Sequence, residues 1–124
     1  MSRDDNVETT KKGYAAFAAG DLEGALQAFD DDVEWIQPGK STLSGTYHGK
    51  GEVVELLGKI AGKQFATKPN RIIADGDVVV ALTDVTVEGE STTGADVFTF
   101  RDGKIVKTES FGDTAVTERI FGTK

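Results

Sequence analysis

Residues 78–112 read VVVALTDVTVEGESTTGADVFTFRDGKIVKTESFG, and this stretch decides the fold. Its β-branched and aromatic residues gather in three runs, at about 78–88, 92–101 and 104–112, and this composition is typical of strands. The dipeptides Glu88-Gly89 and Asp102-Gly103 separate the runs and favour tight turns between antiparallel neighbours. A fourth run, at about 64–75, precedes another turn dipeptide, Asp75-Gly76. The pattern therefore predicts an antiparallel meander of four strands.

Before residue 63 the apolar residues follow the spacing of helices instead of strands. Three helices are expected, with stripes at Val7, Tyr14, Phe17 and Ala18, at Leu22, Ala25, Leu26 and Phe29, and at Val53, Leu56, Leu57 and Ile60. A short strand, Val33–Gln37, should lie between the second and the third helix. Helices grouped before strands indicate an α+β fold. We expect a long curved sheet with three helices against its concave face, enclosing a pocket. The tail, residues 114–124, could be a pocket lid, a dimer contact or a packed end.

Composition limits the possible functions. The 124 residues fit one domain, 1–124. The net charge of −7 argues against nucleic-acid and anionic-membrane partners, which need a basic surface. No cysteine is present and His48 is the single histidine, so we expect neither a metal site nor a cofactor. The polar N-terminus and the lack of a long apolar run predict a soluble, cytoplasmic protein.

Four segments resemble a known superfamily. They are YAAFAAGDLEG (14–24), FDDDVEW (29–35), GTYHGK (45–50) and FTFRDGKIV (98–106). In order and spacing they are similar to the ketosteroid isomerase, SnoaL-like and nuclear-transport-factor-2-like superfamily. The resemblance covers about residues 5–113. It implies a cone-shaped, cystatin-like α+β barrel, usually a homodimer, with a largely apolar pocket.

The same resemblance implies a set of site residues. Ketosteroid isomerases stabilise an oxyanion with a tyrosine and a protonated aspartic acid, and move a proton with an aspartate base. Tyr14 and Asp96 match the first two positions. Gln37, directly before Pro38, stands at the position of the base. Because an amide cannot accept and release a proton as a carboxylate does, the resemblance does not extend to the isomerase base.

Asp96 can also be interpreted without the resemblance. On a strand it shares a face with Phe98 and Phe100. A carboxyl among aromatic rings is costly to ionise, so its pKa should rise. In its neutral form it could donate a hydrogen bond to an oxyanion, as Tyr14 could. Alternatively the two residues form a buried pair without chemistry, or Tyr14 simply lies on the surface of its helix.

A second carboxylate offers a candidate base. If the turn before residue 92 has three residues, Asp84 lies opposite Asp96 and the two share a proton. A two-residue turn would place them on opposite faces of the sheet. Three further residues are candidates for ligand binding: Trp35 and Phe98 as pocket walls, and Gln37 as a group that orients a ligand oxygen.

Two functions remain open at this point. The first is an enzyme of isomerase, cyclase or lyase type, which transfers a proton without a cofactor on an apolar, carbonyl-bearing substrate. Steroids, terpenoids and polyketides are such substrates. The second is a non-catalytic protein of the same fold that binds such a small apolar molecule.

Overall fold

The computed structural model describes residues 3–62 and 66–123. Its helices are α1 (Arg3–Ala18), α2 (Leu22–Leu26), α3 (Gly49–Ala61) and α4 (Thr114–Phe121). Its strands are β1 (Phe29–Gln37), β2 (Gly45–His48), β3 (Ala66–Asp75), β4 (Val78–Val87), β5 (Glu90–Arg101) and β6 (Lys104–Gly112). The predicted strand at 64–75 corresponds to β3, and its first two residues lie outside the described part of the chain.

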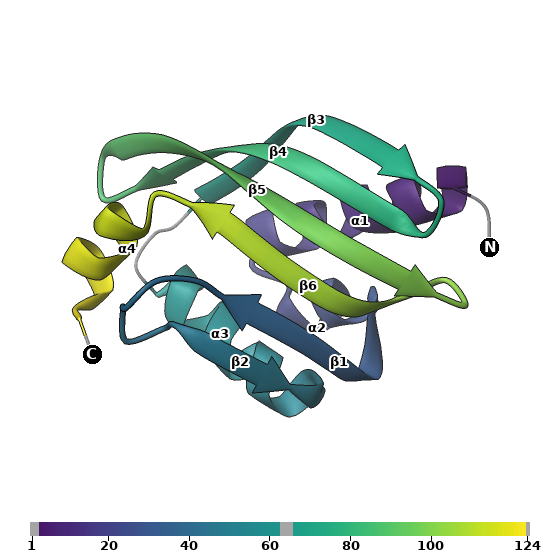
Figure 1. The fold of residues 1–124 in the computed structure, drawn as a ribbon, viewed down its shortest axis with the longest axis horizontal. Helices are drawn as coiled ribbons and strands as arrows, with labels where there is room; N and C mark the ends of the chain where they lie inside the picture. The colour runs from purple at the N-terminus through teal and green to yellow at the C-terminus, as the bar shows by residue number, and fades with distance from the viewer. Residues whose placement is uncertain (1–2, 63–65, 124) are drawn as a thin grey trace.

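The six strands form one curved sheet in the order β2-β1-β6-β5-β4-β3 (Figure 1). The meander from β3 to β6 is antiparallel, which confirms the prediction. Two features of the expected antiparallel barrel need correction. β1 pairs with β6 in a parallel arrangement, and the sheet stays open, with β2 and β3 as its edges. The α+β class is confirmed.

The segment after α2 differs from its prediction. The helix ends at Leu26, and Phe29 begins β1 instead of extending the helix. Three consecutive aspartates disfavour a helix C-terminus, which prefers cations. In the strand, Phe29 pairs with Ile105 of β6 and becomes buried. The predicted strand 33–37 therefore starts four residues earlier, at residue 29.

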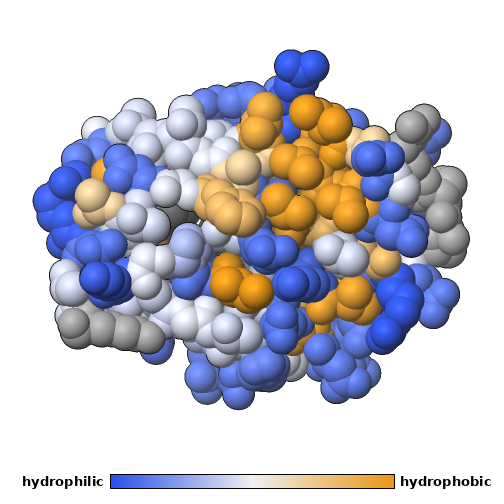
Figure 2. All heavy atoms as spheres, in the orientation of Figure 1, coloured by the Kyte–Doolittle hydropathy of each residue, from blue (hydrophilic) through white to orange (hydrophobic). Residues whose placement is uncertain are grey.

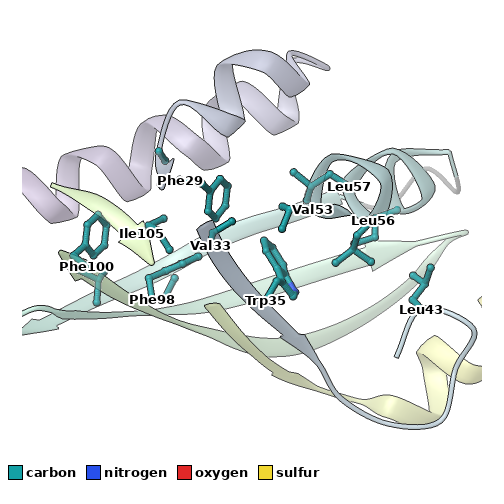
Figure 3. Packing of buried hydrophobic residues seen from close by; sticks show 14 residues of the cluster. Phe29, Val33, Trp35, Leu43, Val53, Leu56, Leu57, Phe98, Phe100 and Ile105 are labelled. Carbon is teal, nitrogen blue, oxygen red and sulfur yellow. The ribbon is translucent and has the colours of Figure 1, made fainter. Parts of the chain in front are cut away.

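The core lies between the inner face of the sheet and the helices. α3 buries the four residues that its helical spacing predicts, Val53, Leu56, Leu57 and Ile60. In Figure 3 the side chains of Val33 and Trp35, from β1, extend toward this helix, and Phe98, Phe100 and Ile105 continue the same layer. Residues of β4, β5 and β6 on the inner face line a cavity together with residues of α4, the helix that flanks this end of the sheet (Figure 1).

Apolar residues also gather on the outer face of the sheet. Neighbouring outward positions on β3, β4 and β5 carry Ile73, Val78, Val80, Leu82 and Val97, which we call the outer patch. It appears as the orange area in Figure 2, which looks onto this face. Ile73 is 46% exposed. Helices α1, α2 and α3 lie behind the sheet in this view (Figure 1).

The tail forms a fourth helix that the sequence did not predict. Asp113 caps α4, because its Oδ1 accepts hydrogen bonds from the amides of Ala115 and Val116 at 3.1 and 3.3 Å. An ion pair between Arg119 and Glu90 ties the helix to the start of β5. No residue of α4 is fully buried. Within the described residues, no helix has the length and apolar character needed to cross a bilayer.

Candidate functional site

A cavity of about 160 Å³ lies between the inner face of the sheet and the helices. Its wall is largely apolar and includes Phe17, Phe29, Trp35, Leu57, Ile60 and Phe98. Helix α4 contributes Thr114, Val116 and Thr117. The polar lining of the cavity includes several threonine hydroxyls, Asp113 near α4, and a group of four side chains, Tyr14, Gln37, Asp96 and Ser110.

Tyr14 and Asp96 meet in this cavity. Tyr14 comes from the C-terminal part of α1 and Asp96 from the middle of β5, and the hydroxyl of Tyr14 donates a hydrogen bond to Oδ2 of Asp96. The ring of Tyr14 stands edge-on to Phe98, with 5.9 Å between the ring centroids and 77° between the planes. Asp96 shares the inner face of β5 with Phe98 and Phe100, as the strand alternation predicts.

Ser110 completes the group from the neighbouring strand. It lies directly opposite Asp96 in the ladder between β5 and β6. Its hydroxyl donates to the other carboxyl oxygen, Oδ1 of Asp96, at 3.0 Å. Each oxygen of the carboxyl group therefore has one hydroxyl partner.

Burial controls the protonation of this group. Desolvation raises the pKa of Asp96 above its usual value, and the hydrogen bonds from Tyr14 and Ser110 offset only part of this effect. The pKa of Tyr14 is raised as well, first by desolvation and then by the neighbouring carboxylate. Tyr14 therefore stays a neutral hydroxyl, and Asp96 holds its proton to higher pH than an exposed aspartate does.

Gln37 lies at the end of β1, two residues after Trp35 on the same face of the strand. The indole Nε1–H of Trp35 donates to Oε1 of Gln37 at 3.1 Å. An indole nitrogen can only donate, so this bond fixes which end of the amide is the oxygen. One lone pair of the Gln37 oxygen is thus used, and the NH2 group keeps both hydrogens for other partners.

Comparison with known proteins identifies the family. A model of the SnoaL-like domain matches residues 11–108. The chain belongs to the SnoaL-like domain family. This confirms the resemblance seen in the sequence.

Solved structures of other proteins are similar to this SnoaL-like domain. A protein of unknown function with the nuclear-transport-factor-2-like fold, from Burkholderia pseudomallei, is 31% identical, with a TM-score of 0.84 and 98% of each chain covered. The protein TerC, co-crystallised with polyporic acid, is 30% identical, with a TM-score of 0.82 and coverage of 94% of this chain and 98% of TerC. Bal32a, from a soil-derived mobile gene cassette, is 23% identical and has a TM-score of 0.89, with coverage of 96% and 98%; this likeness concerns the fold.

Relatives in sequence include an uncharacterized protein of Mycobacterium tuberculosis. It is 38% identical over 85 residues, which are 68% of this chain. The match spans 57% of the length of that protein.

Asp84 does not take part in the site of this SnoaL-like domain, which corrects one of the expectations. The turn between β4 and β5 has two residues, Glu88 and Gly89, both with positive φ, at 48° and 84°. This turn places Asp84 opposite Thr93 and Asp96 opposite Ala81. Asp84 is consequently exposed on the outer face, while Asp96 faces the cavity. A shared proton between the two carboxyls is therefore impossible.

The inward position of Ser110 cannot be predicted from strand alternation, because the pairing of β6 with β5 is irregular. The pairing of β5 with β6 shifts between Thr99 and Phe100. As a result Ile105 and Thr108 are both buried although they are three residues apart, and a strict alternation counted from Ile105 points Ser110 the wrong way. The same shift explains why Glu109 is on the outer face, where it lies 3.7 Å from Lys107. The threonines of α4 were not predicted as cavity residues, because their segment has no clear strand or helix pattern.

The remaining ionisable groups lie away from the cavity or at its edge. His48 is exposed at the end of β2, directly before α3. Asp113 lines the mouth of the cavity, but one of its oxygens caps α4. Among the residues that the structure describes, no three histidine, aspartate or glutamate side chains gather closely enough to hold a metal ion.

Proposed function

We propose that this SnoaL-like domain binds a small, largely apolar molecule through a carbonyl or hydroxyl oxygen, and that Tyr14 and Asp96 stabilise negative charge on that oxygen. The observation that carries the proposal is the hydrogen-bonded group of Tyr14, Asp96 and Ser110 inside an apolar cavity. Such a group is costly to bury. Binding a ligand oxygen would explain why these polar groups are kept in an apolar cavity.

The protonation states support the proposal. With Asp96 protonated, Tyr14 and Asp96 together carry two O–H hydrogens, and the bond between them uses only one. The other is available to a guest oxygen. A donor held in place in an apolar cavity stabilises developing negative charge far better than water-exposed donors do. The raised pKa of Asp96 extends the pH range in which this donor exists.

The size of the cavity limits the size of the ligand. Its volume of about 160 Å³ is close to that of an engineered protein cavity, roughly 150 Å³, that holds benzene. One ring of a ligand therefore fits beside Asp96, and a larger steroid-, terpenoid- or polyketide-like molecule would extend toward α4. The co-crystallisation of TerC, which is 30% identical, with polyporic acid supports a small-molecule function.

A catalytic version of this function is supported by the same carboxyl group. A raised pKa brings Asp96 closer to the range in which a general acid or base works best. Asp96 could then exchange a proton with a polarised substrate in an isomerase, cyclase or lyase reaction. Gln37 cannot serve as the base, because its oxygen accepts from Trp35 and its nitrogen carries no basic lone pair.

The probe that tests the proposal is 4-nitrophenol, whose neutral and ionised forms absorb differently. Binding that stabilises negative charge should shift the bound probe toward its ionised spectrum. Tyr14→Phe should weaken binding by roughly tenfold, which corresponds to one lost hydrogen bond of about 1.4 kcal/mol. Tyr47→Phe is the control, because the Tyr47 hydroxyl bonds the carbonyl of Leu43 outside the cavity. Binding that both variants share with the natural protein would contradict the proposal.

We also propose that two copies of the chain pair through the outer patch. Sheet faces of this kind are buried when a second layer covers them, and in a symmetric dimer the same patch serves both copies. The charges beside the patch are mixed. Lys68 of β3 is opposite Asp84. Lys107 of β6 is opposite Glu34 and 3.7 Å from Glu109. Apolar contact therefore carries the proposed pairing.

A further inference from the structure

Three polar residues form a row across the inner face of the sheet. Ser110 of β6 is directly opposite Asp96 of β5. On the other side of β6, Ile36 of the parallel strand β1 is the partner of Glu109. One residue further along both strands, Gln37 lies beside Ser110. The row therefore runs from Gln37 through Ser110 to Asp96, and all three line the cavity.

The two ends of this row offer different hydrogen-bonding groups. Asp96 is bonded to Tyr14 and Ser110, as described above. The amide oxygen of Gln37 is bonded to Trp35. No partner within the described residues is assigned to the amide nitrogen of Gln37. Because an NH2 group has two hydrogens and no acceptor capacity, the amide nitrogen offers a donor at this end of the row.

We propose that Gln37 is a specificity-determining residue, which selects ligands that carry a second acceptor oxygen across the ring from the oxygen held by Tyr14 and Asp96. The inference rests on the function proposed above and names its substrate class: a small ring compound with two acceptor oxygens at opposite ends. A guest that displaces water from this donor and offers it only a hydrocarbon edge leaves it without a partner, which lowers affinity.

The spacing of the row is consistent with such a ligand. Neighbouring strands lie about 4.8 Å apart, so the backbones at Gln37 and Asp96 are roughly 10 Å apart across β6. Side chains from both ends extend into the cavity and shorten the gap. One ring with an oxygen-bearing group at each end can span it. A ring with one oxygen would satisfy Tyr14 and Asp96 and leave Gln37 unpaired.

Two probes of nearly equal shape test the inference. In 1,4-diacetylbenzene both ends of the ring carry a carbonyl oxygen, whereas 4-isopropylacetophenone replaces one carbonyl by an apolar group. Calorimetric titration of the full chain should show the first probe binding about tenfold more tightly, as expected for one additional hydrogen bond. Gln37→Leu should abolish this preference. Gln37→Glu should abolish it too, because the carboxylate still accepts from Trp35 but has no hydrogen to donate.

The outcomes separate the two proposals. If 4-isopropylacetophenone binds and loses affinity in Tyr14→Phe, but the second carbonyl brings no gain, the role of Gln37 is wrong while the proposed function stands. A preference for the diacetyl probe that persists in both Gln37 variants overturns the role of Gln37 as well. If neither probe binds, or if binding is indifferent to Tyr14→Phe, both proposals fail.

Discussion

The hydroxyl of Tyr14, on the first helix, donates a hydrogen bond to the carboxyl group of Asp96, 82 residues later in the chain. A helix residue and a strand residue meet because α1 packs across the inner face of β3 and β4, next to the strand that carries Asp96. Burial removes water from both groups, so each replaces a lost water hydrogen bond of the other.

Asp96→Asn should change how stability depends on pH. The folded state holds the Asp96 proton more tightly than the unfolded chain, because burial raises its pKa. Stability from this group is therefore complete below the pKa of an unfolded aspartate, about 3.9, and is lost as pH rises to the raised pKa. The slope reaches at most about 1.4 kcal/mol per pH unit. In urea unfolding from pH 3 to 8, the free energy of unfolding of the variant should rise relative to that of the natural protein as pH increases. A constant difference would contradict the prediction.

Ser110→Ala should move the titration of Asp96 further upward. The hydroxyl of Ser110 stabilises the ionised carboxyl by donating to Oδ1, which lowers the pKa of Asp96. Without this hydroxyl, desolvation raises the pKa further. The pH at which binding of 4-nitrophenol weakens should therefore rise in the variant. Ser91→Ala, an exposed position on the same strand as Asp96, should leave the profile unchanged. A profile that moves to lower pH would refute this role for Ser110.

Asp113→Ala should loosen α4 without unfolding the domain. Asp113 accepts from two amides in the first turn of the helix, and loss of such a cap costs about 1 kcal/mol. Since α4 buries no residue fully, the loss should appear as faster amide exchange in residues 114–121. Ligand dissociation should accelerate too, because this helix lines the cavity. Asp113→Asn retains a capping oxygen and should behave like the natural protein.

Leu56→Ala should destabilise the fold strongly. Leu56 is completely buried between α3 and the sheet, and replacing such a leucine by alanine costs about 2–5 kcal/mol. Val54→Ala, on the less buried side of the same helix, should cost much less. Chemical denaturation of the two variants measures the difference, and equal losses would show that α3 is packed differently.

Val80→Lys should disrupt pairing through the outer patch. Val80 lies between Ile73 of β3 and Val97 of β5, so a lysine there puts a charge in the middle of the interface. Analytical ultracentrifugation should give a dimer for the natural protein and a monomer for the variant. Thr86→Lys, on the same face near the end of β4, is the control. A monomeric natural protein at micromolar concentration would refute the dimer.

The sequence predicts those parts of the structure that depend on local periodicity. The spacing of Val53, Leu56, Leu57 and Ile60 identifies α3 and its buried side, because apolar residues recur there on successive helical turns. The alternation around Asp96 identified its inward orientation for a similar reason. Phe98 and Phe100, two and four residues further on, can only be accommodated in the core.

Other parts depend on pairings that a local pattern does not contain. The position of Asp84 depends on whether a turn has two residues or three, and the positive φ of Glu88 was not visible in the sequence. The inward position of Ser110 depends on the register shift in β6. The contact between Gln37 and Trp35 depends on two side-chain conformations at the end of a strand. In each case the local sequence allows more than one arrangement, and tertiary contacts determine which one forms.

The parallel pairing of β1 with β6 has a consequence for synthesis on the ribosome. β1 leaves the exit tunnel before its neighbour β6, and β3, β4 and β5 are made between the two. Until β6 emerges, the segment from α1 to β2 can form its helices and the β1–β2 hairpin, but β1 has no neighbour on its other side. Contacts between such distant segments slow folding, and a nascent chain that stops short of β6 would expose Val33 and Trp35 to chaperones.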